Sequence, residues 1–370
     1  MAEVAGVVAG AVATPASVAE TAEVLRSSTG SVVPVGAGTK TGWAAPPASC
    51  DLLLRTTGLD RVVEHAPGDL VVVAEAGVRL DALRDRLAEH GQQLALDPPE
   101  PGATLGGVVG ANASGPRRLR YGTVRDLLIG VTVVLADGTV ARSGGKVVKN
   151  VAGYDLGKLY TGAHGSLGVV VSTAWRLHPL PPAARTVLVP VRDTAHAGRL
   201  AAELARSPLT PAAAELRWGG ELGEGAEFAV LFESTEASVR AQARAAVALL
   251  GGAAAKAPPA WFGARPEGGL VLRLAYEPAA LTAVLDALPD GSHGNAHACT
   301  GVGYAAVPRD CDLAALRAAL APYDGSAVVV AGTGVDHWGP PGGAFGLMTR
   351  VKDQFDPGRR LSPGRLLGGL

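Results

Sequence analysis

Cysteine is scarce in this sequence. Its three cysteines, Cys50, Cys299 and Cys311, lie far apart, and no Cys-x-x-Cys pair occurs. Such spacing supplies neither a disulfide framework nor the ligands of an iron–sulfur cluster. We therefore expect a reducing, cytoplasmic location, and any iron–sulfur cluster that works with this protein must belong to another chain.

Blocks of like charge and long apolar runs are also missing. The 33 Lys and Arg residues nearly balance the 34 Asp and Glu residues, and the formal net charge of −1 argues against nucleic acid as a partner. Glycine, proline and serine interrupt the apolar segment 4–18, and no charged region precedes it. We expect neither a signal peptide nor a transmembrane helix.

Common catalytic and metal-binding signatures are missing as well. We find no Gly-x-Ser-x-Gly turn and no Ser-His-Asp arrangement, and Lys40 lacks the Walker spacing. His293 and His297 are four residues apart, as metal ligands on a helix can be, but a glycine and an asparagine between them would break a helix. We therefore expect no metal site.

The chain does contain enough apolar residues for two hydrophobic cores. It has 370 residues, of which 48% are hydrophobic, and its 50 glycines and 26 prolines are dispersed between Val/Ala/Leu runs. This length and composition favour a globular protein with two domains.

Hydrophobic periodicity predicts helices and strands in both halves. In the first half we expect helices at 17–27, 78–90 and 156–160, and strands at 32–35, 52–56, 62–65, 70–75, 128–135, 140–142 and 168–177. In the second half we expect helices at 195–206, 239–250, 279–288 and 313–321, strands at 213–218, 228–234, 270–276 and 327–331, and a strand pair within 297–307. This order predicts an α+β fold, in which a mixed first domain precedes an antiparallel sheet with helices on one face.

A proline-rich stretch at 178–182 is typical of a domain boundary. We place the first domain at 1–182, a cap or substrate-like domain at 183–345, and a C-terminal tail at 346–370. The tail is too short to fold alone, so we expect it to dock back on the first domain.

Two glycine-rich runs, at 34–42 and 101–110, indicate a phosphate site. Glycine adopts positive φ at low cost and lets backbone amides approach an anion, so the two runs together predict a cradle for the diphosphate of a dinucleotide. The site is not a Rossmann site, because Gly36-x-Gly38 meets only the first two glycine positions and loop sequence continues after it.

Polar turns follow the second run. Ser114, Thr123 and nearby amides are candidates for contacts with phosphates or a flavin ring, and Arg117 or Arg118 would offset the phosphate charge. The alternative is a solvated basic loop before the strand at 128. A third glycine-rich run at 162–171 invites close approach of an adenine or flavin ring, and its His164 is either a catalytic base or a hydrogen-bonded bystander.

In this order the motifs resemble the flavoproteins of the vanillyl-alcohol oxidase type, which share the FAD-binding PCMH-type domain. The matching motifs are 36–39, 101–107, 121–126, 155–156, 162–170 and, in the tail, 363–365. Within that family, 113–118 and 149–156 look most like the FAD-binding (E) subunits of bacterial glycolate oxidase.

The resemblance implies FAD as the cofactor and a cap domain over the flavin. It also implies an oxidoreductase that oxidises a small 2-hydroxy acid, glycolate, to glyoxylate as part of glyoxylate metabolism. The implied partners are a larger catalytic flavoprotein subunit and an iron–sulfur subunit, with any membrane association arising through the complex. The alternatives are a non-catalytic FAD-binding assembly or electron-relay module, and a free-standing oxidase of the same fold that acts on another alcohol.

The candidate cofactor-binding residues come from all these motifs. They are Val35, Gly36, Ala37, Gly38, Thr39, Lys40, Gly42, Pro101, Gly102, Ala103, Thr104, Gly106, Gly107, Asn112, Ser114, Gly115, Arg117, Thr123, Val124, Asp126, Gly168, Val169, Val170 and Arg365. Oxidation of a hydroxy acid also requires a cation for the carboxylate and a base for the hydroxyl. Arg217 or Arg273 could supply the cation, and His297 or His337 the base, but we assign no catalytic residue.

Overall fold

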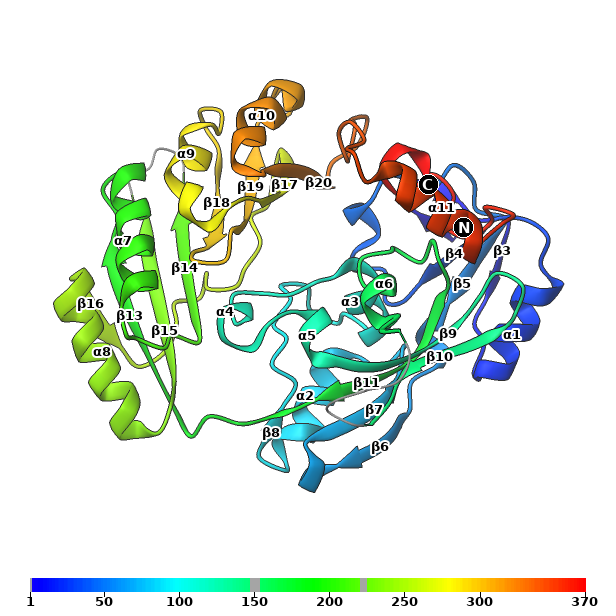
Figure 1. Ribbon diagram of the computed structural model, residues 1–370, viewed down its shortest axis with the longest axis horizontal. Helices are drawn as coiled ribbons and strands as arrows, with labels where there is room; N and C mark the ends of the chain where they lie inside the picture. Colours follow the sequence, from blue (N-terminus) through cyan, green and yellow to red (C-terminus); the bar gives the residue numbers. More distant parts are fainter. Residues whose placement is uncertain (1, 147–153, 220–224) are drawn as a thin grey trace. The chain divides into compact units, whose positions relative to one another are not determined.

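The computed structural model describes residues 2–146, 154–219 and 225–370 (Figure 1). The motif at 149–156, one of the two that resemble glycolate oxidase subunits, therefore lies partly outside the described residues. By internal contacts the chain divides into two compact units: the first comprises Met1–Ser114, Thr123–Leu180 and Pro340–Leu370, and the second comprises Gly115–Gly122 and Pro181–Gly339. Among the described residues no helix is both long and apolar enough to cross a membrane.

The first unit contains two principal sheets. An antiparallel sheet has the order β10-β9-β11-β7-β6, and a smaller parallel sheet has the order β3-β5-β4. Their strands are β3 (Ala11–Ala13), β4 (Val32–Val35), β5 (Leu52–Arg55), β6 (Val62–Ala66), β7 (Val71–Glu75), β9 (Leu128–Val134), β10 (Val140–Gly144) and β11 (Val169–Arg176). The helices of this unit include α1 (Val18–Ser27), α2 (Leu80–Ala88), α3 (Leu105–Ala111), α5 (Val124–Leu127), α6 (Gly157–Tyr160) and α11 (Phe345–Phe355).

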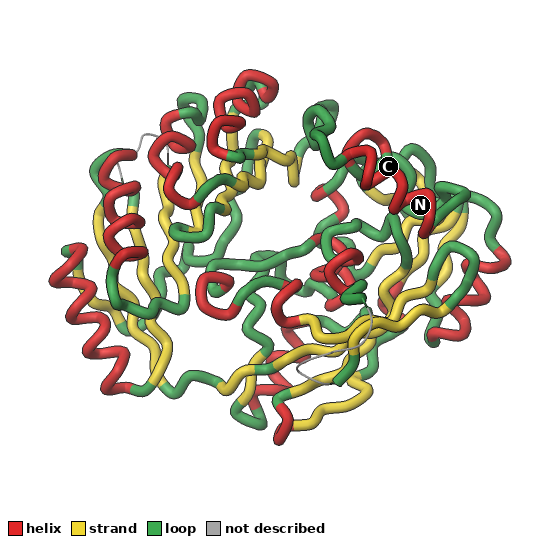
Figure 2. Tube along the Cα trace, viewed as in Figure 1, coloured by secondary structure: helices red, strands yellow, loops and turns green. Residues whose placement is uncertain are grey.

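The second unit is built on an eight-stranded antiparallel sheet. Its order is β16-β13-β15-β14-β18-β19-β17-β20, with strands β13 (Ala183–Pro190), β14 (Ala213–Trp218), β15 (Glu227–Ser234), β16 (Ala253–Ala255), β17 (Leu270–Ala275), β18 (His293–His297), β19 (Val302–Val307) and β20 (Ser326–Ala331). Helices α7 (Thr194–Arg206), α8 (Glu236–Leu250), α9 (Leu281–Asp286) and α10 (Leu313–Leu320) lie along one face of this sheet (Figure 2). The predicted α+β fold class is confirmed.

Helix α7 illustrates why the predicted periodicity was reliable here. The Asp193 side chain accepts a hydrogen bond from the amide of His196 at 2.6 Å and caps the first turn. Ala197, Leu200 and Leu204 then recur at helical spacing and are fully buried against the sheet.

Three of the elements that were not predicted are informative. Strand β13 follows the proline-rich stretch directly, and α11 buries only Lys352 completely, so its periodicity gave little indication of a helix. The second glycine-rich run, at 101–110, is not a loop throughout, because helix α3 begins at Leu105. Glycine costs a helix about 1 kcal/mol relative to alanine, but tertiary packing overrides this cost, since Val108 and Val109 are completely buried.

The C-terminal tail packs within the first unit. The buried Lys352 ammonium group donates to the Ser166 carbonyl at 2.7 Å, to Asp356 at 2.6 Å and to the Leu361 carbonyl at 2.8 Å. The Ser362 amide donates to the Val32 carbonyl at 2.8 Å, at the start of β4. These bonds hold the tail beside the glycine-rich run that follows β4.

Candidate functional site

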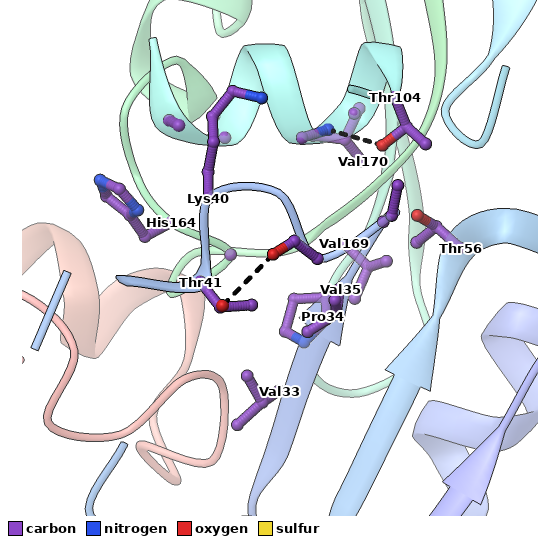
Figure 3. A pocket seen from close by; sticks show the side chains of 18 of the residues that line it. Val33, Pro34, Val35, Lys40, Thr41, Thr56, Thr104, His164, Val169 and Val170 are labelled. Carbon is purple, nitrogen blue, oxygen red and sulfur yellow. Dashed lines mark hydrogen bonds between the residues drawn. The ribbon is translucent and has the colours of Figure 1, made fainter. Parts of the chain in front are cut away.

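Both glycine-rich runs line one pocket of the first unit, with an empty volume of about 790 Å³ (Figure 3). They are in contact there: a Cβ atom on Gly36 would lie 2.0 Å from the Thr104 hydroxyl oxygen. Gly36 must therefore lack a side chain for the first run to pack against the second. The expected convergence of the two runs is found in the structure.

Three backbone amides of the first run have no hydrogen-bond acceptor among the described residues, and we call them unoccupied. Gly38 has φ +78°, and a Cβ atom there would meet nothing within 4 Å, so the backbone conformation, rather than crowding, requires glycine. In the described part of the chain, the amides of Ala37, Gly38 and Thr39 donate to no protein acceptor. Consecutive unoccupied amides in such a turn form a concave anion-binding site.

The second run presents a helix face instead. The first amides of α3 are already used: Leu105 donates to the Val78 carbonyl at 2.9 Å, Gly106 to the Ala76 carbonyl at 2.8 Å, and Gly107 to the Thr104 hydroxyl at 3.3 Å. A Cβ atom on Gly110 would have no neighbour within 4 Å. This run therefore provides a surface free of side chains, not the donor amides that we expected from a loop.

Two buried cations belong to the pocket. The Lys40 side chain is 5% exposed; its ammonium donates to the Thr39 hydroxyl at 3.1 Å and lies 3.8 Å from a Glu100 carboxylate oxygen. The Arg365 guanidinium donates to the Thr41 carbonyl at 2.7 Å, and burial lowers the pKa of Arg365 to about 10. Arg365 therefore remains charged near pH 7. Positive charge beside unoccupied amides favours a polyanion.

The predicted cofactor residues fall into two groups. Those that line the pocket are Val35, Gly36, Ala37, Gly38, Thr39, Lys40, Thr104, Gly106, Gly107, Gly168, Val169, Val170 and Arg365. Those outside the lining are Gly42, Pro101, Gly102, Ala103, Asn112, Ser114, Gly115, Arg117, Thr123, Val124 and Asp126. The pocket thus draws on the first run, the helix face, the third run and the tail.

Several residues outside the lining have structural partners. Thr123 and Asp126 form a capping box at the start of α5, with the Asp126 carboxylate accepting from the Thr123 amide at 2.7 Å. Gly115 and Arg117 belong to the second unit, where Arg117 donates to the buried Glu233 carboxylate at 2.6 Å. By contrast, the side-chain amide oxygen (Oδ1) of Asn112 and the Ser114 hydroxyl are buried without a hydrogen-bond partner among the described residues.

Sequence reasoning missed some lining residues, including Val4, Thr56 and Tyr160. They lie outside the three glycine-rich runs, in a short strand, a 3-10 turn and a short helix. His164 also lines the pocket, at φ +48°. Its position is compatible with either of the roles considered above.

Three of the four candidate catalytic side chains lie against protein neighbours in the second unit. The Arg217 guanidinium lies over the Trp261 ring, 5.5 Å from its centroid, and the His337 ring is 3.0 Å from the Val329 carbonyl. The buried His297 ring lies 3.3 Å from the buried Glu215 carboxylate. Within the described ranges no cluster of three potential metal ligands forms.

Comparison with known proteins identifies the first unit. Residues 9–144 match the family model described as FAD binding domain. The chain is 34% identical over 189 residues to the glycolate oxidase subunit GlcD of Bacillus subtilis, a match that covers 50% of this chain and 39% of that protein. It is 40% identical over 124 residues to the glycolate oxidase subunit GlcE of Escherichia coli, covering 33% and 35% respectively.

Two further matches cover more of this chain. The D-lactate dehydrogenase of Archaeoglobus fulgidus is 32% identical over 240 residues, covering 60% of this chain and 53% of that protein. A solved alkyldihydroxyacetonephosphate synthase superposes with a TM-score of 0.71 over 95% of this chain and 75% of that one, at 16% identity, which is a likeness of fold. The matches to these three curated relatives span about half of their lengths or less.

Residues 9–144 belong to the FAD binding domain family, and the chain has the PCMH-type FAD-binding fold with a large antiparallel sheet domain. The predicted family and the predicted cofactor, FAD, are confirmed. The pocket fits this cofactor, because unoccupied amides and two buried cations suit a diphosphate, and a helix face without side chains admits a flat or extended ligand closely.

Proposed function

We propose that this chain is the FAD-binding subunit of a glycolate oxidase-like complex, which oxidises a small 2-hydroxy acid and passes the electrons onward. The observation that carries this proposal is the pocket after β4, where three unoccupied amides and the cations of Lys40 and Arg365 face one cavity. Two of the relatives described above are glycolate oxidase subunits by name, and a third is a D-lactate dehydrogenase. All three act on 2-hydroxy acids according to their names.

Each group of lining residues has a distinct task in this proposal. The amides of 37–39 bind the diphosphate, and Lys40 and Arg365 offset its charge. The face of α3 and the strand start at Val169 and Val170 exclude water from the adjoining part of the ligand.

When bound, FAD takes up the two electrons and the proton equivalents that leave glycolate as it becomes glyoxylate. The three dispersed cysteines do not supply the ligands of an iron–sulfur cluster, so a cluster that accepts these electrons would belong to another chain. We propose a larger flavoprotein and an iron–sulfur protein as partners, with membrane association through them.

A non-catalytic FAD-binding module is the second candidate. It is favoured by the second unit, where Arg217 lies over the Trp261 ring and the His337 ring contacts the Val329 carbonyl. In that case substrate would be oxidised on the larger subunit alone. A free-standing oxidase that acts on another alcohol is a third candidate, and it predicts reoxidation by oxygen without a stable complex.

One anaerobic experiment separates these functions. The purified chain is loaded with FAD and mixed with glycolate or D-lactate, first alone and then after co-expression with a candidate larger flavoprotein and a candidate iron–sulfur protein. Bleaching of the flavin absorbance in the chain alone indicates autonomous catalysis. Activity that requires the co-purified partners and FAD on this chain supports the subunit. If FAD-free variants of this chain support full activity in the complex, the proposal is wrong.

A further inference from the structure

Tyr160 is a buried residue with an unused polar group in the pocket. It ends α6, is 2% exposed, and packs its ring edge-on against Phe355, with centroids 6.0 Å apart and an interplanar angle of 88°. Its ring also lies close to the third glycine-rich run, because a Cβ atom on Gly168 would be 3.2 Å from the Tyr160 ring. The ring is therefore held in place from two sides.

The hydroxyl of Tyr160 is the exception to this packing. It is buried, yet it has no hydrogen-bond partner among the residues that the structure describes, and the residue lines the pocket. Buried hydroxyls are almost always paired, because an unpaired one loses its bonds to water without replacement. An unpaired buried hydroxyl on a residue that lines a ligand pocket thus points to a partner on the ligand.

We propose that the Tyr160 hydroxyl donates a hydrogen bond to FAD and so fixes the position of the nucleotide in the pocket. This inference rests on the proposed occupation of the pocket by FAD. Phenylalanine would supply the same packing against Phe355 and Gly168, so packing alone does not explain the hydroxyl.

The hydroxyl is a suitable neutral donor. Burial raises the pKa of Tyr160 to about 12, so the group keeps its proton at all physiological pH values. The charged groups of the pocket, Lys40 and Arg365, are associated with the 36–41 turn, whereas Tyr160 adjoins Gly168. We therefore expect its acceptor to be a neutral ring or ribityl atom of FAD rather than a phosphate oxygen.

The test is the Tyr160→Phe variant, studied with and without FAD. The dissociation constant for FAD should rise about threefold to tenfold, the range expected for one net hydrogen bond. The thermal stability of the FAD-free variant should equal or exceed that of the FAD-free wild type, because the substitution removes an unpaired buried hydroxyl. If the hydroxyl has only a structural role, Tyr160→Phe should leave the dissociation constant for FAD unchanged and should lower the thermal stability of the FAD-free protein.

Tyr276→Phe is the matched control. Tyr276 is buried in the second unit, and burial also raises its pKa, but it does not line this pocket. FAD affinity should be unchanged in this variant. Titrations of Tyr160→Phe with FMN and with ADP tell which half of FAD carries the acceptor.

The outcomes separate this inference from the proposed function. If the wild type binds no FAD, both are overturned. If the wild type binds FAD and Tyr160→Phe binds it equally well, only the role of Tyr160 is overturned.

Discussion

The two glycine-rich runs of the first unit have similar compositions but opposite hydrogen-bonding states. After β4, the amides of 37–39 are unoccupied and Gly38 holds a positive φ. At the start of α3, the amides of 105–107 already donate to protein oxygens. A glycine-rich run can therefore serve a ligand in two ways: it can offer backbone amides, or it can leave a helix face free of side chains.

A charge placed in the first run should have the largest effect. Gly38→Asp puts a carboxylate beside the proposed diphosphate, and two like charges about 4 Å apart at an effective dielectric constant of 20 repel by about 4 kcal/mol. This corresponds to roughly a thousandfold loss of affinity. The protein should therefore purify without FAD, as judged by its absorbance spectrum.

Gly38→Asn is the matched control for that variant. Asparagine has nearly the same size as aspartate and, like aspartate, can adopt a positive φ, but it carries no charge. It should retain FAD with at most about a tenfold loss of affinity. If both variants retain FAD at full occupancy, the first run does not bind the diphosphate of FAD.

A methyl group on the packed side of α3 should reduce stability. The Cβ atom of Gly106→Ala would lie 2.8 Å from the Ala76 Cβ and 3.2 Å from the Ala76 carbonyl oxygen, so the helix must shift. Overpacking of this kind costs about 1–3 kcal/mol in the free energy of unfolding. Urea unfolding of the FAD-free protein measures the change, and an unchanged midpoint would contradict the packing.

A methyl group on the open side of α3 should spare stability and reduce binding. The Cβ atom of Gly110→Ala has no neighbour within 4 Å, and replacing a helix-interior glycine by alanine stabilises by about 0.5–1 kcal/mol. If FAD lies against this face, its dissociation constant should rise about tenfold. An FAD affinity equal to that of the wild type would mean that the ligand lies elsewhere in the pocket.

The smallest effect concerns pH. Arg365 has a pKa of about 10 because burial disfavours its charge, so it loses its proton as the pH rises through that value. FAD affinity should fall across this range in the wild type. In Arg365→Met the affinity should already be lower at pH 7 and should fall less steeply, as measured by flavin fluorescence titration between pH 8 and about 10.5. Parallel curves for both proteins would exclude Arg365 as a counter-charge.

The sequence predicts the parts of the fold that depend on periodicity and local turns. Helix α7 follows from the spacing of Ala197, Leu200 and Leu204, and the hairpin of β9 and β10 follows from its Asp-Gly turn. Helix α3 could not be predicted in this way, because its glycine content opposes a helix and only contacts with β7 and its neighbours stabilise it.

The site was predicted in the same uneven way. Gly36, Gly38 and Lys40 were predicted because an anion site needs amides and positive charge, and the structure places them in the lining of one pocket. Arg117 has the right chemistry, but its guanidinium binds Glu233 of the second unit, a long-range contact that no local pattern reveals. Tyr160 was missed because its place in a short helix does not distinguish it from a core residue until its hydroxyl is located.

Hydrogen–deuterium exchange with and without FAD tests the contrast between the two runs most directly. We expect the amides of 37–39 to exchange rapidly in the FAD-free protein and to become protected when FAD binds, whereas the amides of 105–107 should be protected in both states. Unchanged exchange at 37–39 on addition of saturating FAD, or protection that appears only at 105–107, would contradict it.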